Sequence, residues 1–168
     1  MKAGFARWFS WAKDQELSRR VEILSQSPVF VGLPSAFLGR LSAKLFEKSY
    51  EAGDEVFHEG EPGRGLFVVW EGEVHLVAGD DAAVLATLGP GSSFGELALL
   101  DEMPRSATAR VVARSRLLIL YRSDFEALVE ADRALTLIVM RNLLRMLSAY
   151  VRRTNLQLAE LRAAVPAP

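Results

Sequence analysis

The pattern of apolar and polar positions divides the chain into three stretches, and the first has helical spacing. Through residues 1–27, aromatic and aliphatic side chains recur at near-helical spacing. The apolar positions are Phe5, Trp8, Phe9, Ala12 and Leu17, and the basic residues that flank them are Lys2, Arg7 and Lys13. Such a face suits a helix docked on the domain or on a partner, or a helix lying in a membrane interface. We favour docking because the stretch is short.

Proline ends this first helix and begins the next. The residue before a proline is disfavoured in the helical region, so Ser27-Pro28 should break the first helix. A second helix is predicted from Pro34-Ser35, with Ser35 as its N-cap. Its apolar face carries Leu38, Leu41 and Leu45.

From about Lys48 the helical period gives way to short apolar runs separated by glycine-containing turns, such as Glu71-Gly72. Several short strands with close turn signals predict an antiparallel barrel or sandwich. The predicted strands are Glu55–His58, Leu66–Trp70, Val74–Ala78, Ala83–Leu88, Ala107–Ala113 and Arg116–Tyr121.

Helical spacing returns at Ser123, which forms a capping-box pair with Glu126. The longest predicted helix follows, from about Asp132 to Leu161, and its apolar residues step by three and four. They are Leu137, Met140, Leu144, Leu147, Val151, Thr154, Leu158 and Leu161, and we call them the stripe. Core packing would explain its first half. The second half extends past the other elements and predicts pairing with a second chain.

These elements divide the chain into three predicted segments of an α+β protein. Residues 1–27 form an N-terminal helical extension, and residues 28–131 form a β-rich domain with flanking helices. Residues 132–168 form the long last helix, which serves as lid and dimerisation helix, and a loose tail.

Composition excludes several classes of protein. The chain has 168 residues, half of them hydrophobic, with 20 basic against 21 acidic side chains. This balance argues against disorder and gives no general attraction to nucleic acid. Without cysteine there is no disulfide and no thiol catalysis. Arg7 and Lys13 interrupt any signal-peptide core, and no apolar run approaches the roughly 18 residues of a membrane span. We therefore expect the cytoplasm.

Catalytic chemistry finds little support. The two histidines, His58 and His75, fall in different predicted strands without a clear carboxylate partner, which makes a weak metal site. The glycines at 89, 91 and 95 are spaced too widely for a dinucleotide fingerprint and lie among antiparallel strands. We expect no enzyme.

The stretch Phe94–Val111, FGELALLDEMPRSATARV, carries the binding chemistry. Gly95 permits close backbone approach, and the turn of helix after it presents unpaired N–H groups that suit a phosphate. Arg105 can add its two-donor fork, and Ser106 a hydroxyl. Glu96 beside a phosphate makes sense if it accepts a hydrogen bond from a ligand hydroxyl, such as one on ribose. The alternative is that Arg105 and Glu96 form an ordinary surface ion pair.

FGELALL followed by PRSATA resembles the phosphate-binding cassette of the cyclic nucleotide-binding domain family. That family includes catabolite activator proteins, protein kinase A regulatory subunits and cyclic nucleotide-gated channels. PVFVGL at Pro28–Leu33 and YEAGDEVFHEGEPG at Tyr50–Gly63 also match its pattern, and the resemblance covers about residues 28–155. It implies a β-roll of jelly-roll type with two C-terminal helices, and a cyclic nucleotide as ligand rather than a cofactor.

The resemblance also implies roles for single residues. Arg105 should pair with the cyclic phosphate, and Glu96 should accept the ribose 2′-hydroxyl, helped by Gly95. Backbone N–H groups at Ala98 and Ser106 should complete the phosphate cradle. Serine at position 106 implies cAMP rather than cGMP.

Two more positions concern the last helices. Leu97 corresponds to the apolar switch residue of the family, which packs against the helices that follow. Tyr150 and Val151 stand where catabolite activators place a polar pair against the base. Tyr150 therefore stacks on the purine or has only a packing role. Arg64 also departs from the family pattern, at a position not expected to touch ligand.

Two functions follow as hypotheses. The first is a cyclic nucleotide receptor, a homodimer through its last helix, that acts on an unknown protein effector. The second is an interaction or scaffold module with weak or no ligand binding, attached to a membrane surface by its first helix. Catabolite activators carry a DNA-binding helix-turn-helix after the long helix, for which too few residues remain here, so no nucleic acid is expected.

Overall fold

The computed structural model describes residues 15–79 and 83–164. The aromatic face predicted before Leu17, and with it the membrane-interface interpretation, lies outside these residues. Residues 15–26 are helical and the helix stops before Ser27-Pro28, which confirms the predicted break. Leu24 of this helix is completely buried in the domain core, so the helix docks on the domain.

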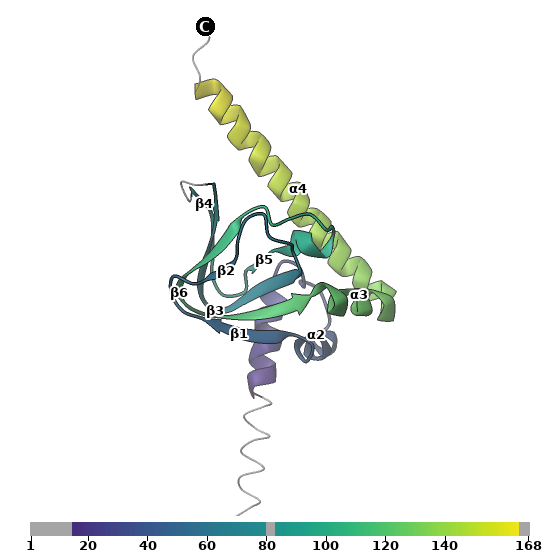
Figure 1. The fold of residues 1–168 in the computed structure, drawn as a ribbon. Helices are drawn as coiled ribbons and strands as arrows, with labels where there is room; N and C mark the ends of the chain where they lie inside the picture. Colours follow the sequence, from purple (N-terminus) through teal and green to yellow (C-terminus); the bar gives the residue numbers. More distant parts are fainter. Residues whose placement is uncertain (1–14, 80–82, 165–168) are drawn as a thin grey trace, which may run out of the picture.

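In the described residues, six antiparallel strands form one sheet that curls into a β-roll (Figure 1). The strands are β1 (Phe46–Tyr50), β2 (Glu55–Phe57), β3 (Gly65–Ala78), β4 (Ala83–Leu88), β5 (Ser93–Phe94) and β6 (Thr108–Tyr121). The order β1-β6-β3-β4 runs through the sheet, while β2 pairs with β6 and β5 pairs with β3. The fold is α+β, as the sequence predicts, and matches the predicted β-roll.

Two long strands replace four of the predicted short ones. The sequence predicts a turn at Glu71-Gly72, but β3 continues through it and stays paired with β6 across register shifts on both sides of Glu71. Gly72 has a φ of 90°, and a Cβ there would collide with the backbone of Arg114 and Ser115. The glycine therefore marks a β-bulge rather than a chain reversal. The sequence predicts neither β1 nor β5, and β1 begins at Phe46, before the change of pattern expected at about Lys48.

Four helical elements complete the described fold besides residues 15–26. They are α2 (Ser35–Ser42), the 3₁₀ helix η1 (Glu96–Leu99), α3 (Arg122–Ala131) and α4 (Arg133–Ala164). Two predicted caps are wrong. Pro34, not Ser35, is the N-cap of α2, and no side chain caps it. Strand β6 runs directly into α3, so the already extended Tyr121 takes the N-cap position in place of Ser123.

The sheet separates two hydrophobic clusters. Alternate residues of a strand point to opposite faces, and along β6 Leu118 and Leu120 join the helix-side core while Leu117 and Ile119 face the interior of the roll. The helix-side cluster also contains Phe125 of α3 and Val139 and Leu143 of α4; the interior cluster also contains Phe57, Phe67, Phe94 and Val111. The helices thus cover one face of the sheet, and they do not fill the end of the roll near β5 and η1.

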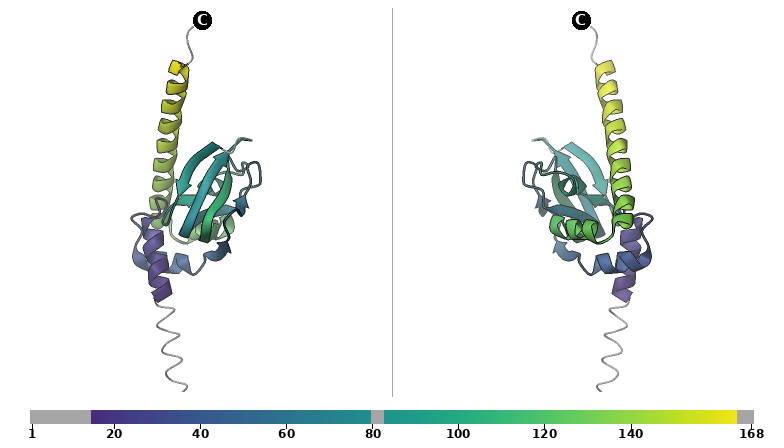
Figure 2. Two further views of the ribbon diagram at one scale, coloured as in Figure 1. Left: turned by 90° about the vertical axis from the view of Figure 1, so that its left-hand side faces the viewer. Right: turned by 90° about the vertical axis from the view of Figure 1, so that its right-hand side faces the viewer.

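Helix α4 packs on the domain mainly through a face other than the stripe, although Met140 of the stripe also contacts the core. Val139 and Leu143 are 5% and 1% exposed, whereas Leu137 and Leu144 of the stripe are 70% and 63% exposed. Core packing therefore accounts for Met140 in the first half of the stripe, which packs against the helix-side cluster, but not for Leu137 or Leu144. Periodicity detects an apolar face but does not say which neighbour covers it. Past the domain, α4 projects alone (Figure 2).

Length and composition allow one described helix to cross a membrane, Arg133–Glu160 of α4, with a mean hydropathy of 1.3 in its best window. This qualifies the expectation that nothing in the chain approaches a span. The evidence is weak, because Arg141 and Arg145 interrupt the segment and its first half packs against the domain.

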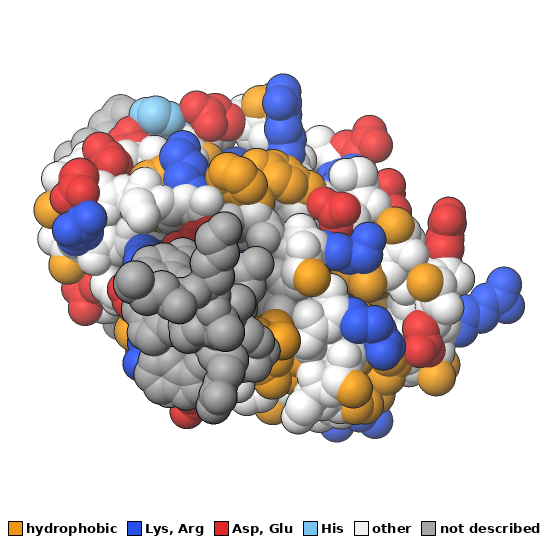
Figure 3. Space-filling view, turned by 90° about the horizontal axis from the view of Figure 1, so that it is seen from below, with side chains coloured by type: hydrophobic (Ala, Val, Ile, Leu, Met, Phe, Trp, Pro, Cys, Tyr) orange, Lys and Arg blue, Asp and Glu red, His pale blue; other side chains and the backbone are white. Residues whose placement is uncertain are grey.

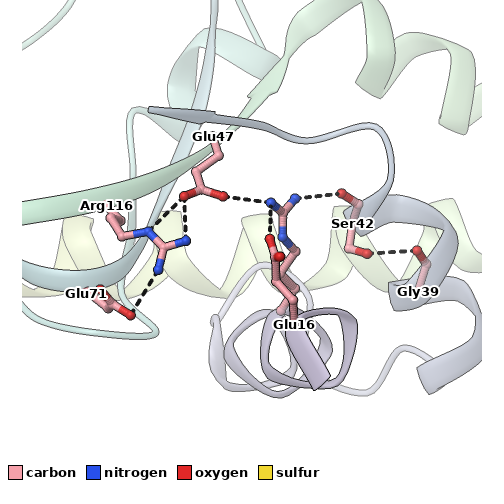
Figure 4. A network of polar contacts seen from close by, with 7 residues as sticks. Glu16, Gly39, Ser42, Glu47, Glu71 and Arg116 are labelled. Atoms are coloured by element: carbon pink, nitrogen blue, oxygen red, sulfur yellow. Dashed lines mark hydrogen bonds and ion pairs between the residues drawn. The ribbon is translucent and has the colours of Figure 1, made fainter. Parts of the chain in front are cut away.

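An ion-pair network fastens helix 15–26 to the sheet (Figure 4). The carboxylate of Glu47 in β1 forms ion pairs with Arg20, at an N–O distance of 2.7 Å, and with Arg116 of β6, at 2.6 Å. Arg116 also forms an ion pair with Glu71 at 3.3 Å. Both guanidinium groups lie over the ring of Trp70, at 5.1 and 4.0 Å from its centre. The N-terminal helix is therefore attached to β1, β3 and β6 by charge as well as by the burial of Leu24.

Candidate functional site

A cavity of about 690 Å³ opens between the end of the β-roll and α4. Its walls come from residues 84–88 of β4, residues 93–98 and 103–107 of the central stretch, and one face of α4. Small-molecule sites usually have volumes of about 300–1,000 Å³. All seven residues predicted for the site line this one cavity: Gly95, Glu96, Leu97, Ala98, Arg105, Ser106 and Tyr150.

Gly95 makes room for the guanidinium group of Arg105. It follows β5, adopts a φ of 72° and is the N-cap of η1. A Cβ at this position would stand 2.5 Å from Arg105 Nη1. The backbone thus needs glycine here for its left-handed conformation and for this close approach.

Arg105 is a buried cation held by backbone carbonyls. Only 8% of it is exposed, and it donates from Nη1 to the carbonyl of Gly95 and from Nη2 to that of Gly65, both at 2.9 Å. Its guanidinium lies 4.1 Å over the ring of Phe57 and 5.6 Å over that of Phe67. Nε is buried without a partner among the described residues. Burial lowers the pKa of Arg105, partly offset by the charges of Glu96 and Glu61.

Glu96 is a buried carboxylate, 5% exposed, at the start of η1. Burial raises its pKa above 4.5, although its own backbone N–H, the Tyr150 hydroxyl and the charge of Arg105 act in the opposite direction. Among the described residues, Glu96 and Arg105 are not within ion-pair distance of each other, and both are buried. The alternative of an ordinary surface ion pair is therefore wrong. The two charges do not pair directly with each other, so each can meet a different group of one ligand.

Tyr150 links α4 to this carboxylate. Its hydroxyl hydrogen-bonds Glu96, and burial, the charge of Glu96 and this bond raise the pKa of Tyr150 to about 12. The hydroxyl is therefore a neutral donor at physiological pH. This contact was not foreseen from the sequence, which offers stacking on a purine or packing for Tyr150, and stacking stays a prediction.

The backbone of the cassette is fixed by the turn at residues 60–61. Gly60 donates its N–H to the carbonyl of Arg105 at 2.9 Å, and Arg105 donates its own to the carbonyl of Glu61 at 2.8 Å. The Ala98 N–H, predicted to face phosphate, bonds the Gly95 carbonyl at a long 3.3 Å. Ser106 is exposed at the cavity.

Arg122 at the start of α3 holds the far end of the cassette helix. Its Nε donates to the Ala98 carbonyl at 2.8 Å, and Nη2 donates to the carbonyl of Asp101. A shift of η1 would therefore be felt at α3. Leu97 is partly buried and lines the cavity, and its role as a switch stays a prediction.

Several site residues escaped sequence analysis because strand pairing or helix packing brings them in. Gly65 accepts from Arg105 across 40 positions, and Phe57 and Phe67 lie beneath the same guanidinium. Arg153, Thr154 and Gln157 of α4 also line the cavity. The signal that could have found these three is their three-and-four spacing from Tyr150.

The histidines do not assemble a metal site. His58 contacts Glu55 and Glu61, and His75 contacts Glu73 at 3.3 Å, so each has a carboxylate neighbour, contrary to expectation. In residues 15–79 and 83–164, however, no group of three or more metal-ligating side chains comes together.

The sequence model of the cyclic nucleotide-binding domain matches residues 47–132. The cyclic AMP receptor protein of Thermus thermophilus is 38% identical over 135 residues, which are 79% of this chain and 61% of that protein. The chain thus spans about three fifths of this relative's length.

Two solved structures are similar in both sequence and fold. The N-terminal domain of a transcriptional regulator from Streptomyces coelicolor A3(2) has a TM-score of 0.69 and 34% identity, covering 79% of this chain and 92% of that one. The regulatory domain of Toxoplasma gondii PKA, solved with cAMP, has a TM-score of 0.63 and 35% identity, covering 67% and 44%.

Proposed function

Because this chain belongs to the cyclic nucleotide-binding domain family, we propose that it is a cytoplasmic, non-enzymatic receptor for a cyclic nucleotide. It prefers cAMP to cGMP, changes conformation on binding and signals through a protein partner. The observation that carries the proposal is the pair of buried, mutually unpaired charges, Arg105 and Glu96, in one cavity of ligand size. Burying a charge is costly, and a bound ligand would give each of these charges a partner beyond the carbonyls that Arg105 bonds and the Tyr150 hydroxyl that bonds Glu96.

Each charge fits a different part of a cyclic nucleotide. The guanidinium of Arg105 is suited to the cyclic phosphate, which is an anion. The carboxylate of Glu96 is an acceptor suited to the ribose 2′-hydroxyl. Support for cAMP comes from Ser106, and from the names of the Thermus receptor and of the Toxoplasma domain solved with cAMP.

The signal would travel through contacts that already join the cassette to the last helices. Tyr150 of α4 bonds Glu96, and Arg122 of α3 bonds the end of η1. A ligand hydroxyl at Glu96 competes with the Tyr150 hydroxyl, so binding would alter how α4 rests on the cavity. Such coupling between a ligand and a helix position is typically about 1–3 kcal/mol.

Calorimetric titration of the folded chain tests the receptor. We expect saturable, one-to-one binding of cAMP, and weaker binding of cGMP. A chain that stays folded but binds neither nucleotide would contradict the proposal and leave the interaction or scaffold module as the function.

We further propose a homodimer through the exposed part of the stripe. Leu137, Leu144, Val151 and Leu158 are 70%, 63%, 60% and 45% exposed and follow one face of α4. A second copy of α4 would bury them as a coiled-coil seam.

No nucleic acid is expected as a partner. Acidic and basic side chains are interspersed rather than gathered by sign on the face shown in Figure 3.

Leu144→Glu should convert the dimer to a monomer, because it places a charge in the seam where apolar burial is needed. Light scattering after size exclusion measures the mass. Leu156→Glu is the matched control, since Leu156 is 66% exposed, outside the stripe, and should leave the dimer intact. Equal masses for both variants would show that the stripe is not the interface.

A further inference from the structure

Helix α4 has a third face besides the one that lines the cavity and the stripe. Each residue advances by about 100° around the axis of a helix. Tyr150 and Gln157 lie on the cavity side, and Leu144 and Val151 lie on the stripe. The third face is about a third of a turn from each of these. It consists of five exposed residues, which we call the basic face: Arg141, Arg145, Ala149, Arg152 and Leu156.

Positive charge is concentrated on α4. The helix contains six arginines and a single acidic residue, Glu160. The whole chain has 20 basic and 21 acidic side chains, so the remainder of the chain is acidic. The basic face therefore has a charge opposite to that of the protein that carries it.

The arginines of the basic face have no counter-ions in the described part of the chain. On the sheet, Arg110 and Arg116 pair with glutamates at 2.9 and 2.6 Å. In residues 15–79 and 83–164, none of the three arginines of the basic face forms an ion pair. Arg141 and Arg145 also stand four positions apart, where like charges on a helix repel each other. The charge of this face is therefore available to an acidic partner.

We propose that the basic face of α4 is the docking surface for the protein effector, and that the effector meets it with an acidic amphipathic helix. The inference rests on the proposed function, because it gives the chemistry of the partner through which the receptor signals. Leu156 is 66% exposed and lies among the arginines. A helix with glutamates around an apolar side chain would pair the charges and bury Leu156.

Two other anionic partners fit this face less well. Duplex DNA and an anionic membrane are extended surfaces, which would also meet and repel the acidic remainder of the chain. Leu156 gains nothing from a phosphate backbone, and one leucine among the five residues gives little insertion into lipid. A single helix can contact α4 alone where it projects past the domain (Figure 2).

The basic face is connected to the ligand site through α4 itself. The hydroxyl of Tyr150 bonds Glu96, and Tyr150 lies between Ala149 and Arg152 in the same helix. A ligand that displaces Tyr150 therefore moves the basic face as well. Since the stripe is a separate face, a second copy of the chain and an effector can be bound together.

The probe for this surface is a synthetic peptide with glutamate and leucine on one helical face, titrated into the full chain. We expect saturable binding that weakens as salt screens the charges, and weaker binding of a peptide with the same residues in scrambled order. Phosphatidylglycerol vesicles and duplex DNA are the competing probes. Tighter binding to either of them than to the amphipathic peptide would overturn the inference.

Substitutions on the basic face identify the contact. Arg152→Glu should weaken peptide binding about 3- to 10-fold, because an attraction becomes a repulsion. Leu156→Gln should weaken it by a similar factor, about 3- to 10-fold, through lost apolar burial. Arg114→Glu is the matched control, since the Arg114 side chain is 78% exposed on β6 and the change in charge is the same. It should bind the peptide as wild type does.

The cAMP affinity and the mass of Arg152→Glu should equal those of wild type, because Arg152 lies neither on the cavity wall nor in the stripe. If Arg152→Glu and Leu156→Gln bind the peptide as tightly as wild type does, the inference is overturned while the receptor function stands. A wild-type chain that binds cAMP but not the peptide has the same consequence. A wild-type chain that binds the peptide but no cyclic nucleotide retains the docking surface and loses the receptor function.

Discussion

Replacing Arg105 with alanine should weaken cyclic nucleotide binding by about 10- to 150-fold, the range that corresponds to losing a charge-assisted contact of about 1.5–3 kcal/mol. The guanidinium is buried, fixed by the carbonyls of Gly95 and Gly65, and stacked over Phe57. Its orientation therefore exists before ligand arrives, and no mobile side chain needs to be ordered on binding. Calorimetric titration with cAMP measures the loss.

Two companion variants make this result specific. Arg110→Ala is the control, since Arg110 lies on β6, pairs with Glu55 at 2.9 Å and does not line the cavity; it should bind as wild type does. Arg105→Lys keeps the charge but loses the planar fork, and should fall between wild type and Arg105→Ala. Unchanged affinity in a folded Arg105→Ala, with a cooperative thermal transition, would refute the phosphate role.

The cassette could be predicted from the sequence because its geometry is local. Gly95 and Arg105 are ten positions apart with η1 between them, and turn chemistry and helix signals act over such short stretches. The supports of Arg105 could not be predicted in the same way. Phe57, Phe67 and Gly65 reach it only through the pairing of strands distant in sequence.

The errors in the fold have a common physical cause. A glycine such as Gly72 signals a positive φ, but a turn and a β-bulge use the same conformation, and only the pairing of β3 with β6 distinguishes them. Likewise, α4 has two apolar faces, and both repeat with the same helical spacing, so the sequence pattern alone does not tell which of them packs on the domain. The stripe through Leu144 is the more regular, yet the domain covers the face through Leu143.

The ionised carboxylate of Glu96 should lower the stability of the ligand-free fold. Burial raises the pKa of its carboxyl, so the folded protein holds the proton more tightly than the unfolded chain does. The stability linked to that proton is present below the unfolded pKa and is lost as pH rises through the folded pKa. The ionised carboxylate therefore destabilises the ligand-free fold, while ligand binding requires that ionised form as an acceptor. Stability and binding are opposed at this one residue.

Glu96→Gln should consequently make the free protein more stable and the receptor weaker. We expect the thermal midpoint at neutral pH to rise by about 2–4 °C, the shift that about 1 kcal/mol produces in a chain of this size, and the gain to vanish as pH falls through the carboxyl range. Affinity for cAMP should fall at least about 10-fold, because a charged acceptor is replaced by a neutral one. Scanning calorimetry and titration measure both.

The pH dependence separates this explanation from a general change in stability. Acidification should weaken cAMP binding to wild type as Glu96 takes up its proton, but should affect Glu96→Gln much less. Glu61→Gln is the control. The Glu61 carboxylate is half-exposed and interacts electrostatically with Arg105, but it does not line the cavity. This variant should reproduce neither effect. A Glu96→Gln protein that is less stable than wild type at neutral pH would mean that the carboxylate stabilises the free fold. The buried pair would then be structural, and the case for a ligand hydroxyl at Glu96 would be lost.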